Sequence, residues 1–360
     1  MQRIRNRGNK GDGPPLFSYE FIIQNHADIV SCICMVIFML LIPQATNSFA
    51  SGLIFIHNNV TVPVEGKDAA EKSSVRLDKQ KALQTTMYYH GTEDVYNVVF
   101  YCLVWIIIHA LLQEYIWERT VKRLHLSKVK TSKYYDSGCL VVFYLVSVVW
   151  GLDIIISSGY ATNPPLLWTN YPHSLMSLSL KFFMLTQMGF WLHCYPELVF
   201  MKAKKDEIYS KVVLYTSSLL IIAGAYSMML QRVAVVLLVF HYAVEFLYHL
   251  CRMLHYYGKS QLADPGFHVW QALFILARVA TVIIAIVTLW FGIDAAKDEA
   301  EDLEVEVEED GDVEGSRGGI DLTHSLYRLG GLVFLLAIQM WVAWAFVSSQ
   351  LERTRKKKKT

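Results

Sequence analysis

The segment VWQALFILARVATVIIAIVTLWFGI, residues 269–293, contains one charged side chain, Arg278. A helix of this length and composition can cross the hydrocarbon core of a bilayer, which is roughly 30 Å thick and needs about 20 apolar residues. A charge inside such a helix is costly unless it faces other helices and finds a partner there. The segment therefore predicts a transmembrane helix that packs against neighbouring helices.

Other apolar runs of similar length occur along the 360 residues, of which 54% are hydrophobic. We predict an all-α, polytopic membrane helix bundle of about eight spans. The expected spans are 29–56, 95–116, 138–157, 174–195, 211–230, 233–250, 269–293 and 327–348. There is no Walker motif, GxGxxG, GxSxG or nucleic-acid-binding module in the sequence, so nucleotide, hydrolase and nucleic-acid functions are not indicated.

The spans divide the chain into four parts. These are an N-terminal tail at 1–28, two spans within 29–116 that enclose a loop at 57–93, a six-span bundle at 117–348, and a polybasic tail at 349–360. The bundle contains an acidic loop at 294–325, with twelve carboxylates and one lysine between Asp294 and Glu314. Such a charge block repels itself, so we expect a solvated loop. Weak calcium binding is the alternative, although EF-hand spacing is absent.

The distribution of Lys and Arg predicts the orientation of the chain. If the N-terminus is cytosolic, 22 of the 33 Lys and Arg residues fall on the cytosolic side and 8 on the opposite side. Positive charges favour the cytosolic face, and an even number of spans returns the chain to it. We therefore expect both termini in the cytosol.

Two short motifs agree with this orientation. Asn59-Val60-Thr61 is an N-glycosylation sequon in the first predicted lumenal loop, so Asn59 is a candidate glycosylation site. Lys357 and Lys358 stand fourth and third from the C-terminus, as in dilysine retrieval signals of the endoplasmic reticulum (ER). The alternative for this tail is attraction to anionic lipid headgroups.

Polar residues within the predicted spans are the candidate site residues. His241, Glu245 and His249 lie four residues apart and therefore share one helix face. Glu245 and Arg278 are predicted at similar depths, which suggests an ion pair between their helices. We expect a polar interior formed by the following residues: His109, Glu114, His193, Glu197, His241, Glu245, His249 and Arg278.

Three explanations of this set remain open. The side chains could form interhelical hydrogen bonds, line a polar cavity, or bind a metal with ligands from several helices. The row His241, Glu245, His249 spans two turns and cannot converge on one ion by itself. We assign no catalytic residue, metal or cofactor.

Five stretches carry a family resemblance: QNHADIVSC (24–32), IIIHALLQEY (106–115), RLHLSKVKTSKYYDSGCL (123–140), FWLHCYPELVF (190–200) and HYAVEFLYHLCRM (241–253). With them the chain resembles the translocating chain-associated membrane protein family of the ER, from about residue 16 to 350. The acidic loop and the short C-terminal tail depart from the family pattern. The resemblance implies an accessory role beside the Sec-type protein-conducting channel, with contacts to signal sequences and transmembrane segments of nascent chains. Membrane lipids are further expected partners, and nucleic acids are not.

This family belongs to the wider TLC superfamily, which includes ceramide synthases, so the third to eighth spans would form a TLC-like six-helix core. Lipid or sterol binding is the alternative function, and acyl transfer a more remote one. The synthases carry a His-His pair, then an arginine, then a His-Asp pair that is followed three residues later by a second aspartate. When this pattern is aligned on Arg232, the later histidine falls on His241 and the second aspartate on Glu245. Its adjacent aspartate falls on Tyr242, and Leu214-Tyr215 replaces its histidine pair. Because neither replacement offers an imidazole base, the resemblance implies a protein that is not an enzyme.

Overall fold

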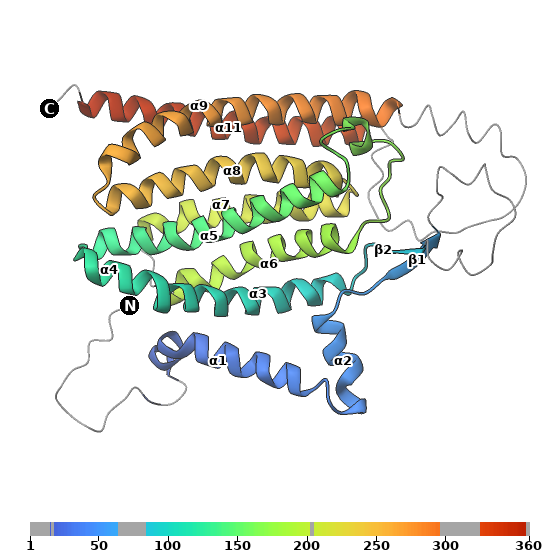
Figure 1. The fold of residues 1–360 in the computed structure, drawn as a ribbon, viewed down its shortest axis with the longest axis horizontal. Helices are drawn as coiled ribbons and strands as arrows, with labels where there is room; N and C mark the ends of the chain where they lie inside the picture. Colours follow the sequence, from blue (N-terminus) through green and yellow to red (C-terminus); the bar gives the residue numbers. More distant parts are fainter. Residues whose placement is uncertain (1–14, 16–17, 64–83, 202–204, 296–324, 358–360) are drawn as a thin grey trace, which may run out of the picture. The chain divides into compact units, whose positions relative to one another are not determined.

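The structure, a computed structural model, describes residues 15, 18–63, 84–201, 205–295 and 325–357 (Figure 1). The predicted acidic loop at 294–325 lies largely outside these residues, and Lys358 lies wholly outside them. The chain forms two compact units: unit 1 comprises residues 1–120 and 174–224, and unit 2 comprises 121–173 and 225–360. Each unit is described separately below.

Unit 1 is built from helices and one β-hairpin. Its elements are α1 (Tyr19–Met39), α2 (Gln44–Ile54), β1 (Asn59–Pro63), β2 (Gln84–Tyr88), α3 (Asp94–Leu111), the π-helical turn η2 (Leu112–Trp117), α6 (Leu178–Phe200) and most of α7 (Lys205–Ser227). The strands are antiparallel, with Asn59 opposite Tyr88. Tyr88 also exchanges two backbone hydrogen bonds with Met176, so the hairpin is tied to the residues that precede α6.

The first predicted span, 29–56, is corrected by the structure. The helix begins ten residues earlier, at Tyr19, where Ser18 caps it by accepting a hydrogen bond from the Phe21 N–H at 3.2 Å. It ends at Met39, and a separate helix follows Pro43. Proline has no N–H to continue a helix, so an apolar run that reads as one span becomes two helices.

The core of unit 1 lies where α1, α3 and α6 meet. Val30 and Cys34 of α1 pack with Cys102 and Ile106 of α3. Gly189 of α6 sits directly against α3, where an added Cβ would lie 2.8 Å from the Tyr101 Cβ. The absence of a side chain at this glycine therefore allows the two helices to approach closely.

Unit 2 is also helical. Its elements are the greater part of α4 (Glu118–Leu124), α5 (Lys128–Ser157), the 3-10 turn η3 (Pro164–Leu167), α8 (Gln231–Tyr256), α9 (Ser260–Ile286), its π-helical extension η4 (Val287–Gly292) and α11 (Ser325–Lys357). Helix α5 ends in a Schellman motif, in which the Tyr160 N–H donates to the Ile155 carbonyl and Gly159 adopts φ 75°.

Helix α8 lies between α5 and α9 in unit 2 (Figure 1). Tyr242 of α8 is buried against Phe143 and Tyr144 of α5, with ring centroids 5.4 and 5.2 Å away. On its other side, Val244 belongs to an apolar cluster with Trp270 and other residues of α9. Phe346 of α11 stacks on α9 at Phe274, so α11 is joined to the unit through aromatic packing.

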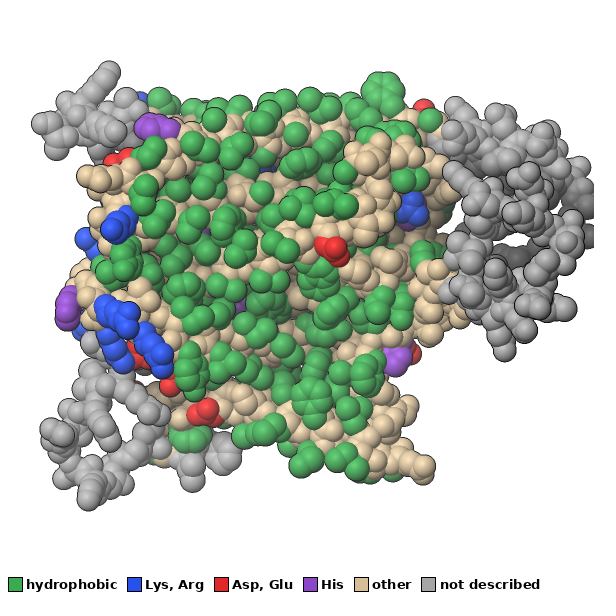
Figure 2. All heavy atoms as spheres, in the orientation of Figure 1, with side chains coloured by type: hydrophobic (Ala, Val, Ile, Leu, Met, Phe, Trp, Pro, Cys, Tyr) green, Lys and Arg blue, Asp and Glu red, His purple; other side chains and the backbone are tan. Residues whose placement is uncertain are grey.

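Seven helices among the described residues are long and apolar enough to cross a membrane. They contain α1, α3, α5, α7, α8, α9 and α11, and the predicted membrane helix bundle is confirmed. Helix α6, at the predicted span 174–195, is less apolar because it carries Lys181, Gln187, His193 and Glu197, all buried. Figure 2 shows hydrophobic side chains over the helices of the face in view, with Lys and Arg gathered where α4 leads into α5. The chain is a multi-pass membrane protein.

Candidate functional site

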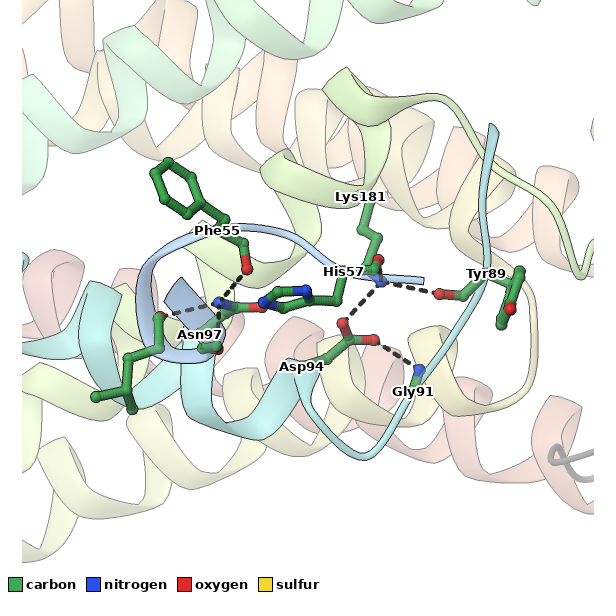
Figure 3. Close-up of polar contacts among 9 residues, drawn as sticks. Phe55, His57, Tyr89, Gly91, Asp94, Asn97 and Lys181 are labelled. Atoms are coloured by element: carbon green, nitrogen blue, oxygen red, sulfur yellow. Dashed lines mark hydrogen bonds and ion pairs between the residues drawn. The ribbon is translucent and has the colours of Figure 1, made fainter. Parts of the chain in front are cut away.

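The most buried charged group in unit 1 is Lys181, near the start of α6 (Figure 3). Its ammonium lies 2.7 Å from the Asp94 carboxylate and donates to the carbonyls of His57 and Tyr89 at 3.1 and 2.8 Å. An ammonium has three N–H donors, and these three partners use all of them. Asp94 in turn accepts from the Gly91 N–H at 2.9 Å. Lys181 therefore joins α6, the start of α3 and both ends of the hairpin segment, and this arrangement is structural.

Asn97, one turn beyond Asp94, is fully buried. Its side-chain amide donates to the carbonyls of Leu53 and Phe55 at 2.9 Å, and Figure 3 shows the contact with Phe55. These carbonyls belong to the C-terminal end of α2, where helix carbonyls have no partner within the helix. Asn97 thus stabilises the end of α2 from a neighbouring helix.

A second polar cluster in unit 1 brings together three of the predicted residues. The Nδ1 atom of His109 lies 3.3 Å from Nε2 of His193, and Nε2 of His109 lies 3.6 Å from a Glu197 carboxylate oxygen. Nδ1 of His193 makes a hydrogen bond to the Phe190 carbonyl. The Trp105 ring stacks on His193 at 6.2 Å. The cluster is therefore enclosed between α3 and α6.

The unit 2 residues form another cluster, centred on Arg278 of α9. Its guanidinium donates to Nδ1 of His241 on α8 at 2.7 Å and to the side-chain oxygen of Gln339 on α11 at 3.2 Å. The described contacts contain no ion pair between Glu245 and Arg278; the bonded partners of Arg278 are His241 and Gln339. Arg278 thus connects three helices through neutral acceptors.

His249 lies on the same face of α8, two turns beyond His241. Its ring is 8% exposed and packs between Tyr144 and Tyr248, with centroid distances of 5.9 and 5.1 Å. No hydrogen-bond partner of its Nδ1 is found in the described part of the chain. His249 therefore acts mainly as an aromatic packing residue of unit 2.

The connection between α5 and α6 contains a buried histidine that sequence reasoning missed. His173 places its two ring nitrogens 3.0 Å from the Thr169 carbonyl and 3.3 Å from the Met229 carbonyl. Its own carbonyl accepts from the Gln231 side chain at 2.6 Å. Burial and the nearby Arg232 guanidinium lower the pKa of His173 to about 4, so the ring is neutral near pH 7. His173 thus fastens the connection to the turn before α8.

The predicted polar interior is therefore divided between the two units. Glu114 joins neither cluster, because it is exposed on η2. Asn59, the candidate glycosylation site, is exposed at the start of β1. Lys357 ends α11, but its side chain and the whole of Lys358 lie outside the described residues. Among those residues, no group of three His, Cys, Asp or Glu side chains is arranged to hold a metal ion.

Sequence reasoning also missed Asp94 and Asn97, because both stand at the polar start of an apolar run, where such residues are common. The signal that could have found Asp94 is Lys181 itself. A lysine near the end of a predicted span needs an acceptor at the same membrane depth, and Glu93 and Asp94 begin a neighbouring span.

Comparisons with known proteins place these clusters in context. The family described as TLC domain matches residues 133–348. Translocating chain-associated membrane protein 2 from Mus musculus is 36% identical over 341 residues, which are 95% of this chain and 84% of that protein. Its Homo sapiens counterpart is 35% identical over the same shares. Ceramide synthase 4 from Mus musculus is 31% identical over 171 residues, covering 47% of this chain and 43% of that enzyme.

Proposed function

Because the chain belongs to the translocating chain-associated membrane protein family, we propose that it is an accessory component of the protein translocation machinery of the ER. In this role it contacts signal sequences and transmembrane segments of nascent chains beside a Sec-type channel and aids their translocation or insertion. The observation that carries the proposal is the match over 95% of the chain to relatives whose name describes association with translocating chains.

The exposed apolar surface of unit 1 suits such contacts. Ile33 and Val36 of α1 are 45% and 58% exposed, whereas Val30 on the inner face is 8% exposed. An open hollow of about 570 Å³ runs along the outer face and includes Ile29, Cys32 and Val36. In a bilayer this face meets either lipid or another apolar helix, and contacts of this kind need no catalytic group.

Site-specific photocrosslinking tests the proposal. A photoreactive residue replaces Ile33 or Val36 in one set of variants and Val30 in a control, and stalled nascent chains with a signal sequence are targeted to microsomes carrying each variant. We expect crosslinks from the two outer positions that disappear after puromycin release, and none from Val30. Absence of crosslinks to several signal sequences, while the channel itself is labelled, would contradict the proposal.

We further propose the topology that the charge distribution predicts, with both termini in the cytosol. Asn59 is then lumenal, and its exposed position on β1 would be accessible to glycosylation. Lys357 and Lys358 would stand in the cytosol, where a dilysine retrieval signal is read.

A lipid- or sterol-binding function is the second candidate, because the partial match to ceramide synthase 4 covers 47% of this chain. Acyl transfer is not proposed. Leu214 and Tyr215 stand where the synthase pattern has its histidines, and neither supplies a general base at neutral pH. Mass spectrometry of lipids that co-purify in nanodiscs distinguishes this function, since a single enriched lipid that is independent of nascent chains would favour it.

A further inference from the structure

Helix α1 carries an exposed carboxylate within its membrane-spanning length. Asp28 lies nine residues after Tyr19, the first residue of the helix, and it is exposed. A charged side chain inside a span normally faces other helices and pairs with the opposite charge there. In the described part of the chain, the Asp28 carboxylate makes no ion pair or hydrogen bond. This face of α1 is therefore suited to a partner that brings a positive charge.

Asp28 lines the hollow on the outer face of α1, together with an apolar stripe formed by Ile29, Cys32, Ile33, Val36 and Ile37. These positions recur at intervals of three and four residues, so they lie on one side of the helix. From Asp28 to Ile37 the stripe extends for roughly 14 Å, at about 1.5 Å per residue. The hollow, about 570 Å³ in volume, thus combines a short apolar surface with a single carboxylate.

The contacts of α1 show at which end of the stripe the carboxylate lies. His26, two residues before Asp28, stacks on Phe200, the last residue of α6, with ring centroids 4.2 Å apart. Val30, two residues after Asp28, packs with Ile106 of α3. In the proposed topology α6 ends at the cytosolic side of the membrane. The carboxylate is therefore at the cytosolic end, and the apolar stripe extends from it toward the lumen.

A second polar side chain lines the hollow at the same end. The α1 backbone departs from helical geometry at Asn25, with φ −118° and ψ 19°, and the side-chain N–H of Asn25 donates to the Phe21 carbonyl at 2.9 Å. The amide oxygen of Asn25 and the carboxylate of Asp28 are both hydrogen-bond acceptors. An ammonium or a guanidinium, which only donates, complements these two groups.

We propose that the stripe binds a signal sequence whose Lys or Arg, placed before the apolar core, pairs with Asp28. The inference rests on the proposed function and adds the residue that selects the partner. A signal sequence has a positive segment followed by about 7–15 apolar residues, which as a helix extend roughly 10–22 Å. The stripe of roughly 14 Å fits this length, whereas a full transmembrane helix spans about 30 Å. Because positive segments stay cytosolic, the bound helix would run parallel to α1.

A double-mutant cycle of photocrosslinking yields tests the pairing. Microsomes carry the full chain with a photoreactive residue at Ile33, in wild-type, Asp28→Asn, Asp28→Glu or Glu20→Gln background. Stalled nascent chains carry one signal sequence with its Lys and Arg residues intact or all replaced by glutamine. Each yield is divided by the yield of crosslinks that the same nascent chain forms with the channel, so that differences in targeting cancel.

We expect Asp28→Asn to lower the yield with the cationic signal sequence about two- to fivefold, the range for an ion pair that is partly open to solvent. Replacing the cations of the signal sequence should lower the wild-type yield by the same factor. Because both changes remove one interaction, the combined loss should equal either single loss. Asp28→Glu retains the charge and should keep the coupling. Glu20→Gln removes an α1 carboxylate that does not line the hollow and should leave the yield unchanged.

The outcomes separate this inference from the proposed function. If Ile33 still crosslinks to signal sequences but Asp28→Asn has no effect, or its loss adds to that of the neutral signal sequence, the inference is overturned and the proposed function stands. A misfolded variant would also give additive losses. Absence of crosslinks from Ile33 to every signal sequence would contradict both.

Two other occupants of the stripe would also overturn the inference. Crosslinks from Ile33 between two copies of this chain, formed without ribosomes, would assign the stripe to self-association. Coupling of Asp28 to a transmembrane segment of about 20 residues with a cytosolic lysine, without coupling to the signal sequence, would assign it to membrane anchors.

Discussion

Replacement of Lys181 by methionine tests whether the buried Lys181–Asp94 ion pair stabilises the part of unit 1 where the β1–β2 hairpin meets α3 and α6. Methionine approximates the length of the lysine stem and fills the same space without charge or N–H donors. The change removes the cation that lies 2.7 Å from the carboxylate of Asp94, a residue that is 4% exposed. It also leaves the His57 and Tyr89 carbonyls without the donors that now reach them at 3.1 and 2.8 Å.

The structure sets the expected magnitude. Removing one partner of a buried ion pair costs about 3–5 kcal/mol, because the remaining charge stays buried. Lys181 has no exposed surface, so solvent screening does not reduce this figure. The double variant Lys181→Met, Asp94→Asn removes both charges and keeps an acceptor for the Gly91 N–H. We expect it to recover at least about 1 kcal/mol relative to Lys181→Met alone.

Thermal unfolding in nanodiscs measures these effects, and Lys181→Met should lower the melting temperature of the 360-residue chain by roughly 4–7 °C. Lys130→Met, which changes an exposed lysine of α5, is the control and should alter stability by less than about 0.5 kcal/mol. A melting temperature for Lys181→Met within about 1 °C of the control, roughly the shift expected from under 1 kcal/mol, would refute the reasoning.

Three further predictions concern other positions. Gly189→Ala should destabilise by about 1–3 kcal/mol in thermal unfolding, because its Cβ would meet Tyr101 at 2.8 Å, whereas Gly224→Ala, with open space around it, should not destabilise. Wild type should lose about 3 kcal/mol as pH falls from about 6.5 to 4, because unfolded His173 binds a proton in this window and the folded residue, with its pKa lowered to about 4, does not. His173→Gln should reduce this loss of stability when melting temperatures are measured across the same pH range. A loss as large as that of wild type would contradict the role given to His173. Asn59→Gln should abolish a glycosidase-sensitive shift in gel mobility, and persistence of the shift would exclude this asparagine as the acceptor.

The helices could be predicted well because bilayer thickness imposes a length that apolar runs reveal directly. The segment 269–293 became most of α9 with η4, whose bounds are Ser260–Ile286 and Val287–Gly292. The break after Met39 could have been inferred, since Pro43 interrupts the apolar run, but the apolar residues on both sides outweighed it.

Side-chain partners could be predicted only to within about one helical turn. Matching the depths of Glu245 and Arg278 identified the correct helices, but the bonded residue is His241, four positions away on the same face. Depth counted from helix ends carries an uncertainty of about 2–4 residues, and one turn is about 3.6 residues, so the argument could not separate the two. Lys181 and Asp94 lie far apart in the sequence, and no local pattern joins them.

Helix α6 has a consequence for the biosynthesis of the protein itself. A segment that contains a lysine, a glutamate and a glutamine enters lipid poorly on its own, since a charged residue raises the insertion free energy, by roughly 2.5–3.5 kcal/mol at the centre of a span and by less near its ends, where Lys181 and Glu197 lie. Asp94 and His109 are on α3, which is synthesised earlier and presents a partner for Lys181 and another for Glu197. Membrane insertion of α6 should therefore depend on α3 being retained nearby until α6 emerges. A chain proposed to assist the insertion of others thus has a helix whose own insertion requires assistance from within.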